Sequence, residues 1–167
     1  VGVNALGLTG ADIDMIRSHK RPLKEGIDFG YVGDVDHANG NMLHTLVEAG
    51  IVPVMAPLTH DGNGNILNTN ADTIASETAK ALAPYYDVTL MFCFEKKGVL
   101  SNPDDDDSVI PSITPEEFKA LVADGTVAGG MIPKLENSFN AIEHGVKQVV
   151  ITLASAIDGK HGTILRG

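Results

Sequence analysis

The chain has 167 residues, of which 43% are hydrophobic, and it carries a formal net charge of −10 at pH 7. That length can bury one core without disulfides, and the acidic charge argues against a nucleic-acid partner. No apolar run is long enough to span a bilayer, so we expect no membrane partner. The single cysteine, Cys93, lies in an apolar run, and we expect a reduced core thiol in a cytoplasmic protein.

The N-terminal part of the chain predicts strands around one helix. Val3–Leu8 is apolar and predicts a strand, and Gly30–Val35 predicts a second strand or one arm of a hairpin. Asn41–Ala49 predicts a helix because its apolar residues share one stripe, with Gly50 at the stop position. Ile51–Ala56 then predicts a buried strand.

Basic residues form a cluster only between positions 17 and 24. One interpretation is a solvated face. The other is a lobe that neutralises the phosphate or carboxylate of a ligand, which an acidic protein needs if it binds an anion. The cluster consists of Arg17, His19, Lys20, Arg21 and Lys24.

The polar stretch from Asn68 to Asp72 lies where a turn meets a helix. Turn residues fill positions 61–65, and Asp72–Leu82 has apolar residues at helical spacing. A helix start exposes unpaired N–H groups and the positive end of the helix dipole. The stretch is therefore either an N-cap with its turn, or a site that holds an anionic ligand or orients cationic side chains.

The second half of the chain predicts two strands with a loop and helices between them. Val88–Phe94 is almost continuously apolar, which is typical of a strand buried on both faces of a parallel sheet. Gln148–Leu153 is the last predicted strand. Between them, Asp104–Asp107 predicts an exposed acidic tip without EF-hand spacing, and Thr114–Glu117 predicts a capped helix start.

The sequence Gly129-Gly130-Met131-Ile132-Pro133-Lys134 is a second candidate site. Two glycines let a backbone approach a ligand closely, and a lysine at a helix start suits a phosphate. A flexible turn with an exposed lysine is the alternative interpretation.

Strands and helices alternate along the whole chain, which predicts a three-layer α/β/α fold on a mostly parallel central sheet. Ligands of such sheets lie beyond the carboxyl ends of the strands. Asn68–Asp72 and Glu95–Leu100 both follow predicted strands, so both are expected at that edge.

The chain resembles the acetylglutamate kinases, a family of the amino-acid kinase superfamily. The resemblance covers nearly the whole chain. It rests on the motifs at Gly30–Val35, Asn68–Asp72, Lys97–Leu100 and Gly129–Lys134, which occur in the order and spacing of that family. It implies an amino-acid kinase-like fold, with residues 1–60 in a substrate lobe and 61–167 in a nucleotide-binding lobe of one domain.

The resemblance also implies a reaction. Such kinases transfer the γ-phosphoryl group of ATP to the side-chain carboxylate of N-acetyl-L-glutamate or a related N-acylglutamate, in arginine biosynthesis. The carboxylate is already ionised at neutral pH, so no general base is needed. The family implies ATP with Mg²⁺ held mainly by phosphates and water, and a homo-oligomer in the cytoplasm.

By this resemblance, Lys134 and Asp72 are catalytic: Lys134 stabilises the transferring phosphoryl group, and Asp72 orients catalytic lysines. Asn68 and Asn70 bind the substrate, and no protein side chain is a metal ligand. The implied nucleotide-binding residues are Glu95, Lys96, Lys97, Gly98, Val99, Leu100, Thr126, Val127, Ala128, Gly130 and Met131.

The chain departs from the family pattern at three places. The family's opening segment, which carries a catalytic lysine and glycine-rich loops, is absent, so the chain resembles the C-terminal part of an incomplete fold. Phe94-Glu95 replaces the usual Thr-Asp, and residues 154–160 replace the usual tail. We therefore expect the 167-residue chain alone to show little or no kinase activity.

Two other functions stay open at this point. The chain is either another member of the superfamily, acting on carbamate, aspartate or a nucleotide, or a catalytically silent fragment that only binds nucleotide.

Overall fold

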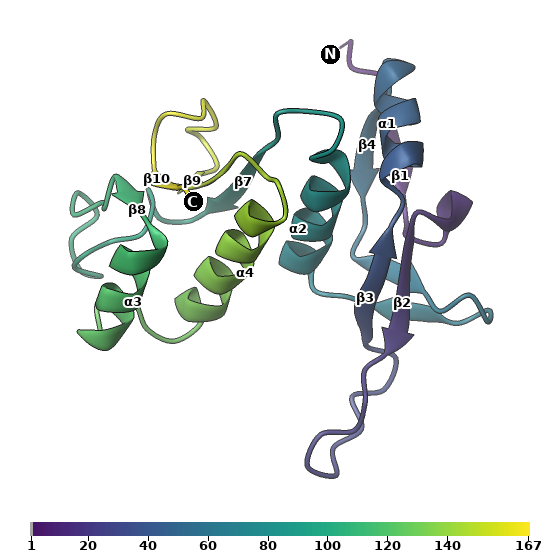
Figure 1. Ribbon diagram of the computed structural model, residues 1–167, viewed down its shortest axis with the longest axis horizontal. Coiled ribbons are helices and arrows are strands. Elements are labelled where there is room, and N and C mark those ends of the chain that lie inside the picture. Colours follow the sequence, from purple (N-terminus) through teal and green to yellow (C-terminus); the bar gives the residue numbers. More distant parts are fainter. Residues whose placement is uncertain (1) are drawn as a thin grey trace. The chain divides into compact units, whose positions relative to one another are not determined.

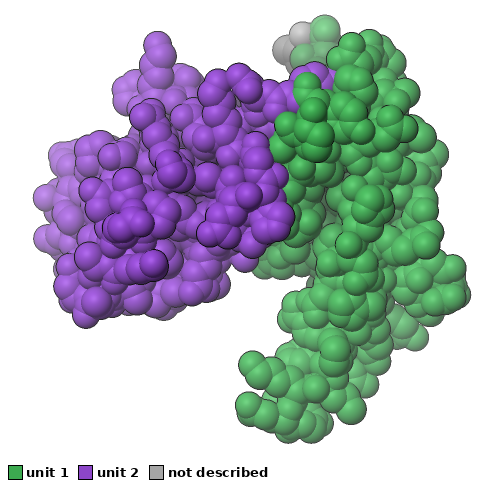
Figure 2. Space-filling model, viewed as in Figure 1, with its two compact units in different colours: residues 1–85 green, residues 86–167 purple. Residues whose placement is uncertain are grey.

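The computed structural model describes residues 2–167, and the chain divides into two compact units, Val1–Tyr85 and Tyr86–Gly167. Figure 2 colours the two units separately. The division follows Tyr85, later in the chain than the change of lobe expected near residue 60. Each unit is described by itself.

The first unit contains two sheets (Figure 1). In the smaller sheet, β1 (Ala5–Leu8) pairs in parallel with β4 (Val52–Met55). The larger sheet has the order β3-β2-β5-β6, and its bounds are β2 Ile16–Lys20, β3 Gly33–Ala38, β5 Leu58–His60 and β6 Ile66–Asn68. β2 pairs antiparallel with β3, so the expected hairpin arm is confirmed.

Two helices and one short 3₁₀ turn complete the first unit. They are α1 (Gly40–Glu48), α2 (Ala71–Leu82) and η1 (Asp12–Asp14). Their apolar faces enclose a core formed by Leu8, Met15, Ile16, Leu43 and Ile74. The predicted helices at 41–49 and 72–82 are confirmed as α1 and α2.

The prediction of a buried strand at 51–56 is wrong for β4, because Val52 and Val54 are 49% and 55% exposed. Within the described residues, β4 pairs with β1 alone, in a two-stranded sheet. One face of that sheet therefore stays open, and alternate side chains of β4 point to it.

The second unit is built on one four-stranded sheet of order β7-β9-β10-β8. β7 and β9 are parallel, β9 and β10 antiparallel, and β10 and β8 parallel. Helix α4 packs against β9, and α3 packs against α4. The bounds are β7 Thr89–Phe94, β8 Ser112–Ile113, α3 Pro115–Ala123, α4 Met131–Glu143, β9 Gln148–Leu153 and β10 Thr163–Leu165.

Strand β7 is buried on one face only, which corrects two expectations. Leu90 and Phe92 are buried, but Met91 is half-buried and Cys93 is exposed. Successive side chains of a strand point to opposite faces, and the face that carries Cys93 is not fully covered, so the predicted double-sided burial and the expected core thiol are both wrong.

The local capping signals are confirmed more closely than the burial. Thr114 accepts a hydrogen bond from the backbone N–H of Glu117, and the Glu117 carboxylate accepts one from the Thr114 N–H. Pro115 is the first residue of α3. The capping box predicted at Thr114–Glu117 is therefore present.

The predicted α/β class is confirmed, with parallel-rich sheets and four α-helices among the described residues. The strands are distributed over three sheets. The expectation that Gln148–Leu153 is the last strand is wrong, because β10 follows it. No helix within residues 2–167 is long and apolar enough to cross a membrane.

Candidate active site

A cavity of about 810 Å³ lies in the second unit, at the carboxyl end of β7 and beside the start of α4. Nine of the eleven predicted nucleotide-binding residues line it: Glu95, Lys96, Gly98, Val99, Leu100, Thr126, Val127, Ala128 and Met131. Cys93, Phe94, Pro103, Gly125 and Ala154 complete the lining. The sequence motifs gave no signal for these last five, apart from Phe94 and Ala154, which lie at two departures from the family pattern.

The loop after β7 is fixed to the sheet through a close backbone contact. A side chain at Gly98 would place its Cβ 2.8 Å from Thr163 Oγ1 and 2.9 Å from Val109 Cγ1, so only glycine fits there. The Val99 N–H donates to Thr163 Oγ1 at 2.8 Å, and that hydroxyl donates to the Ile110 carbonyl at 2.7 Å. These contacts with Thr163 fix the loop so that Val99 and Leu100 line the cavity.

The turn between α3 and α4 forms the opposite wall. The Thr126 N–H donates to Asp124 Oδ1 at 2.9 Å, and this backbone bond lowers the pKa of the Asp124 carboxyl. Gly125 takes a left-handed φ of +82°, and the Val127 N–H donates to the Leu121 carbonyl. Val127 is thereby buried under the cavity while Ala128 stays exposed.

The glycine pair before α4 leaves open space. A Cβ built on Gly129 or Gly130 meets no atom within 4 Å. Gly130 is the N-cap of α4 without a side-chain cap bond, and it does not line the cavity. The N–H groups of Met131 and Ile132 donate to the carbonyls of Ala128 and Gly129, and Pro133 has no N–H, so what a ligand could approach here is the open space beside the two glycines.

Lys134 lies in the first turn of α4, and its ammonium packs on aromatic rings of β7. Its Nζ is 3.4 Å from the centroid of Phe94 and 5.6 Å from that of Phe92. Such cation–π contacts contribute about 0.5–2 kcal/mol. Because Phe94 lines the cavity, this contact places the Lys134 ammonium beside the cavity wall, although Lys134 itself is not a lining residue.

The acidic tip is exposed as expected, and it also forms ion pairs. Lys96 Nζ is 2.7 Å from Asp106 Oδ1, and Lys97 Nζ is 2.5 Å from Asp107 Oδ1. Each pair raises the pKa of its lysine. Lys97 is absent from the lining of this cavity, so the structure separates the two neighbouring lysines.

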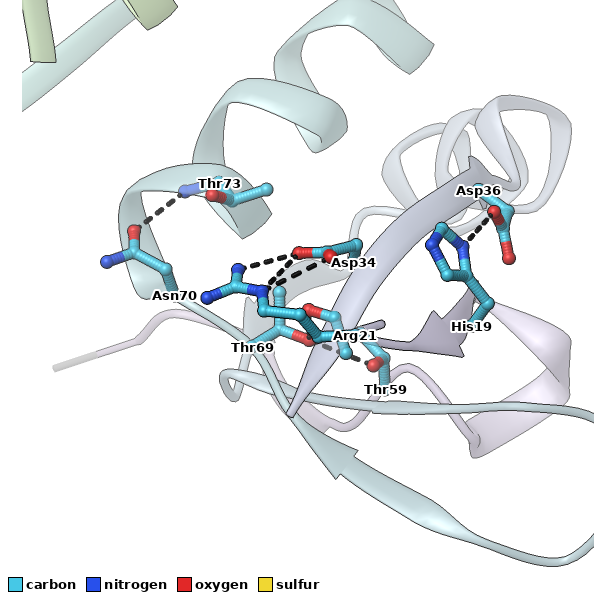
Figure 3. A network of polar contacts seen from close by, with 9 residues as sticks. His19, Arg21, Asp34, Asp36, Thr59, Thr69, Asn70 and Thr73 are labelled. Atoms are coloured by element: carbon cyan, nitrogen blue, oxygen red, sulfur yellow. Dashed lines mark hydrogen bonds and ion pairs between the residues drawn. The ribbon is translucent and has the colours of Figure 1, made fainter. Parts of the chain in front are cut away.

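The stretch Asn68–Asp72 belongs to the first unit, where Asn70 is the N-cap of α2. Its Oδ1 accepts hydrogen bonds from the backbone N–H groups of Asp72 and Thr73 at 2.9 and 3.2 Å (Figure 3). Asp72 follows the cap in the first turn, half-buried. The cap interpretation therefore holds for Asn70, and the Asp72 carboxylate is not the cap.

A buried pair of hydroxyls positions this stretch. Thr59 Oγ1 and Thr69 Oγ1 are 3.0 Å apart, and Thr69 also donates to the Gly33 carbonyl at 3.2 Å. Thr69 is 4% exposed, whereas its neighbours Asn68 and Asn70 are exposed. Alternation along the chain thus anchors Thr69 inward and presents both amides outward.

The basic cluster of the first unit is matched by carboxylates. The Arg21 guanidinium donates to Asp34 at 2.6 Å, and His19 pairs with Asp36 (Figure 3). The Arg21 side chain lowers the pKa of Asp34. Further pairs join Arg17 to Asp14 and Lys20 to Asp28. These pairs favour the interpretation of a solvated face.

The second unit is thus an α/β unit with a glycine-flanked cavity at the carboxyl end of its edge strand, the place where α/β proteins commonly bind small molecules. Residues 2–153 match the model of the amino acid kinase family. The chain belongs to the amino acid kinase family.

Two curated relatives carry the name acetylglutamate kinase. The protein of Phocaeicola vulgatus is 68% identical over 165 residues, and that match covers 99% of this chain and 64% of the relative. The protein of Methanopyrus kandleri is 41% identical over 169 residues, covering 99% and 67%. The chain spans about 64% of the length of the first relative.

Solved structures give the same fold. A crystal structure of a Streptococcus mutans protein superposes with a TM-score of 0.77 at 30% identity, covering 99% of this chain and 62% of that one. N-acetylglutamate synthase from Neisseria gonorrhoeae, complexed with coenzyme A and N-acetyl-glutamate, gives a TM-score of 0.82 at 19% identity, covering 99% and 38%. At that identity the second likeness shows the fold alone.

Proposed function

We propose that this chain carries the nucleotide site and part of the acceptor site of an acetylglutamate kinase of arginine biosynthesis. The observation that carries the proposal is the 68% identity to a relative of that name across 99% of the chain. The cavity of the second unit supports it, because residues expected to bind nucleotide converge on its wall.

The cavity suits an adenine nucleotide. Its volume of about 810 Å³ is within the range of small-molecule sites, and Val99, Leu100 and Val127 give it an apolar wall for a base. The open space beside Gly129 and Gly130, at the positive end of the α4 dipole and close to Lys134, would receive the phosphates. No group of three His, Cys, Asp or Glu side chains that could hold a metal forms within residues 2–167, and Mg²⁺ would come with the phosphates and water.

The reaction needs charge stabilisation rather than proton transfer. An oxygen of the acceptor's side-chain carboxylate would attack the γ-phosphorus of ATP. The bond from that phosphorus to the β–γ bridging oxygen would break, and ADP would leave with the electron pair. The products are an acyl phosphate and ADP, so all atoms and charges balance.

Four residues would serve this transfer. Lys134 would leave the Phe94 ring and neutralise charge on the transferring phosphoryl group, since a cation–π contact of about 0.5–2 kcal/mol is weak enough to exchange for a phosphoryl anion. Asp72 would orient cationic groups around that phosphoryl. Asn68 would bind the acceptor, and the amide nitrogen of Asn70 would do so while its oxygen caps α2.

The same proposal places the protein in the cytoplasm as a homo-oligomer, with the first unit serving the acceptor and the second serving the nucleotide. Both statements rest on the likeness to acetylglutamate kinases.

An acyl-phosphate trapping assay tests the function. The native protein from its source cell is incubated with Mg-ATP, hydroxylamine and N-acetyl-L-glutamate, and the hydroxamate is measured. We expect hydroxamate with N-acylglutamates and a slower or absent reaction with aspartate, carbamate or uridine monophosphate. A faster reaction with one of those three acceptors would contradict the proposal, as would nucleotide binding without any transfer.

A further inference from the structure

A second cavity, of about 420 Å³, lies in the second unit and shares no lining residue with the first. It is formed by the loop before β8, the end of β9 and the turn before β10. Its lining residues are Lys97, Val109, Pro111, Leu153, Ala156, Lys160, His161 and Gly162.

The ionisable side chains in the lining of this cavity are all basic. Lys97, Lys160 and His161 line it, and no aspartate or glutamate does. The ammonium of Lys160 has no ion-pair partner among residues 2–167. Lys97 and His161 each contact one carboxylate outside the lining, so the Lys160 ammonium is the group that most favours an anion in this acidic chain.

The partner of Lys97 can be exchanged. Its ammonium pairs with Asp107, whose side chain is 85% exposed at the rim. Exposed pairs of this kind contribute little stability. A carboxylate entering the cavity can therefore take the place of Asp107 without a large energetic cost.

The turn before β10 holds Lys160 and His161 in place. Asp158 accepts hydrogen bonds from the N–H groups of Lys160 and His161 at 2.9 and 3.0 Å, and from His161 Nδ1 at 2.6 Å. Gly162 follows with a φ of +108°, and a Cβ there would be 2.2 Å from the Ile151 carbonyl oxygen. The turn is thus packed directly on β9.

The remaining wall is apolar. Val109, Pro111, Leu153 and Ala156 supply it, with Val109 and Leu153 half-buried. A ligand that satisfies both parts of the lining carries one negative charge and a compact apolar group. A cavity of this size holds a molecule of that kind, since small-molecule sites begin at about 300 Å³.

We propose that this second cavity binds a small organic carboxylate with an apolar group, through Lys160 and Lys97 on one side and Val109 and Leu153 on the other. The proposal does not rest on the nucleotide cavity, because none of these residues lines it; Lys97, which the family resemblance implies for nucleotide binding, lines the second cavity instead.

The test uses the 167-residue chain, labelled with ¹⁵N, and 4-phenylbutyrate as the probe. We expect saturable amide shifts at residues 160–162 and 109, and no saturable shift with 4-phenylbutylamine, whose charge is reversed. Absence of saturation up to the solubility limit of the probe would overturn the proposal, as would equal binding of the amine.

Two variants identify the residue responsible. Lys160→Gln removes an exposed charge and should weaken phenylbutyrate binding about five- to tenfold. Lys147→Gln removes the same charge from an exposed residue that pairs with Asp87 outside the cavity, and should bind normally. Unchanged spectra away from the turn show that both variants fold. If Lys160→Gln and Lys147→Gln weakened phenylbutyrate binding equally, the change in net charge alone would explain the effect, and the proposed site would be refuted.

Discussion

At the scale of single residues, Lys134 shows what a motif can predict and what it cannot. Its place at the start of a helix after two glycines follows from the sequence. Its contact with Phe94 does not, because β7 and α4 are brought together by the packing of the second unit. The Gly-Gly motif thus predicted a cation beside the expected phosphate position. The structure adds the rings of Phe92 and Phe94, on which this cation packs.

Replacing Lys134 tests its role in the transition state. Lys134→Ala in the native protein should lower kcat by about 10²–10³ and change KM little, because the ammonium acts as charge develops on the phosphoryl group. Steady-state kinetics with N-acetylglutamate and Mg-ATP measures both constants, with Lys147→Ala as the matched control. A change confined to KM would make Lys134 a binding residue only.

Asn70 and Asp72 should differ in their effect on stability, because Asn70 caps α2 in addition to its proposed contact with the acceptor, whereas Asp72 is proposed to act in turnover alone. Asn70→Ala removes the N-cap of α2 and should lower the free energy of unfolding by about 1 kcal/mol. Asp72→Asn keeps the shape of the side chain, so stability should stay near that of the wild type while kcat falls. Urea unfolding and turnover of both variants measure this. Normal turnover of Asp72→Asn would end its catalytic assignment.

At the scale of elements, helices were predicted better than strands. The capping box of α3 and the stop at Gly50 are local signals, and the structure keeps both. β8 has two residues, and β5, β6 and β10 have three each, which is too short to show a period of two. Their pairing is decided by distant neighbours instead.

The contact between Gly98, in the loop after β7, and Thr163, at the start of β10, gives a prediction at the scale of elements. Gly98→Ala places a Cβ 2.8 Å from Thr163 Oγ1 and 3.0 Å from the Thr163 backbone nitrogen. We expect a loss of about 1–3 kcal/mol in the free energy of unfolding, because the loop must shift. Gly130→Ala is the matched control, since nothing lies within 4 Å of its Cβ. Equal free energies of unfolding of both variants in urea would contradict this prediction, because they would show that the loop at Gly98 shifts without loss of stability.

At the scale of the whole molecule, the α/β class follows from the alternation of elements, but burial does not. Val54 and Cys93 are exposed although both lie in apolar strands, because the burial of a strand face depends on what packs over that face, which apolar composition does not contain. The candidate site was predicted where motifs are local, as at Gly98–Leu100. Pro103 and Gly125 reach the same cavity through the fold alone.

The central claim, that the cavity of the second unit is the nucleotide site, is tested most directly by titrating the ¹⁵N-labelled chain with Mg-ATP. The account predicts saturable amide shifts at residues 98–100 and 126–128, which face each other across the cavity. Saturable shifts confined to residues 160–162, or no saturable shift at all, would contradict it.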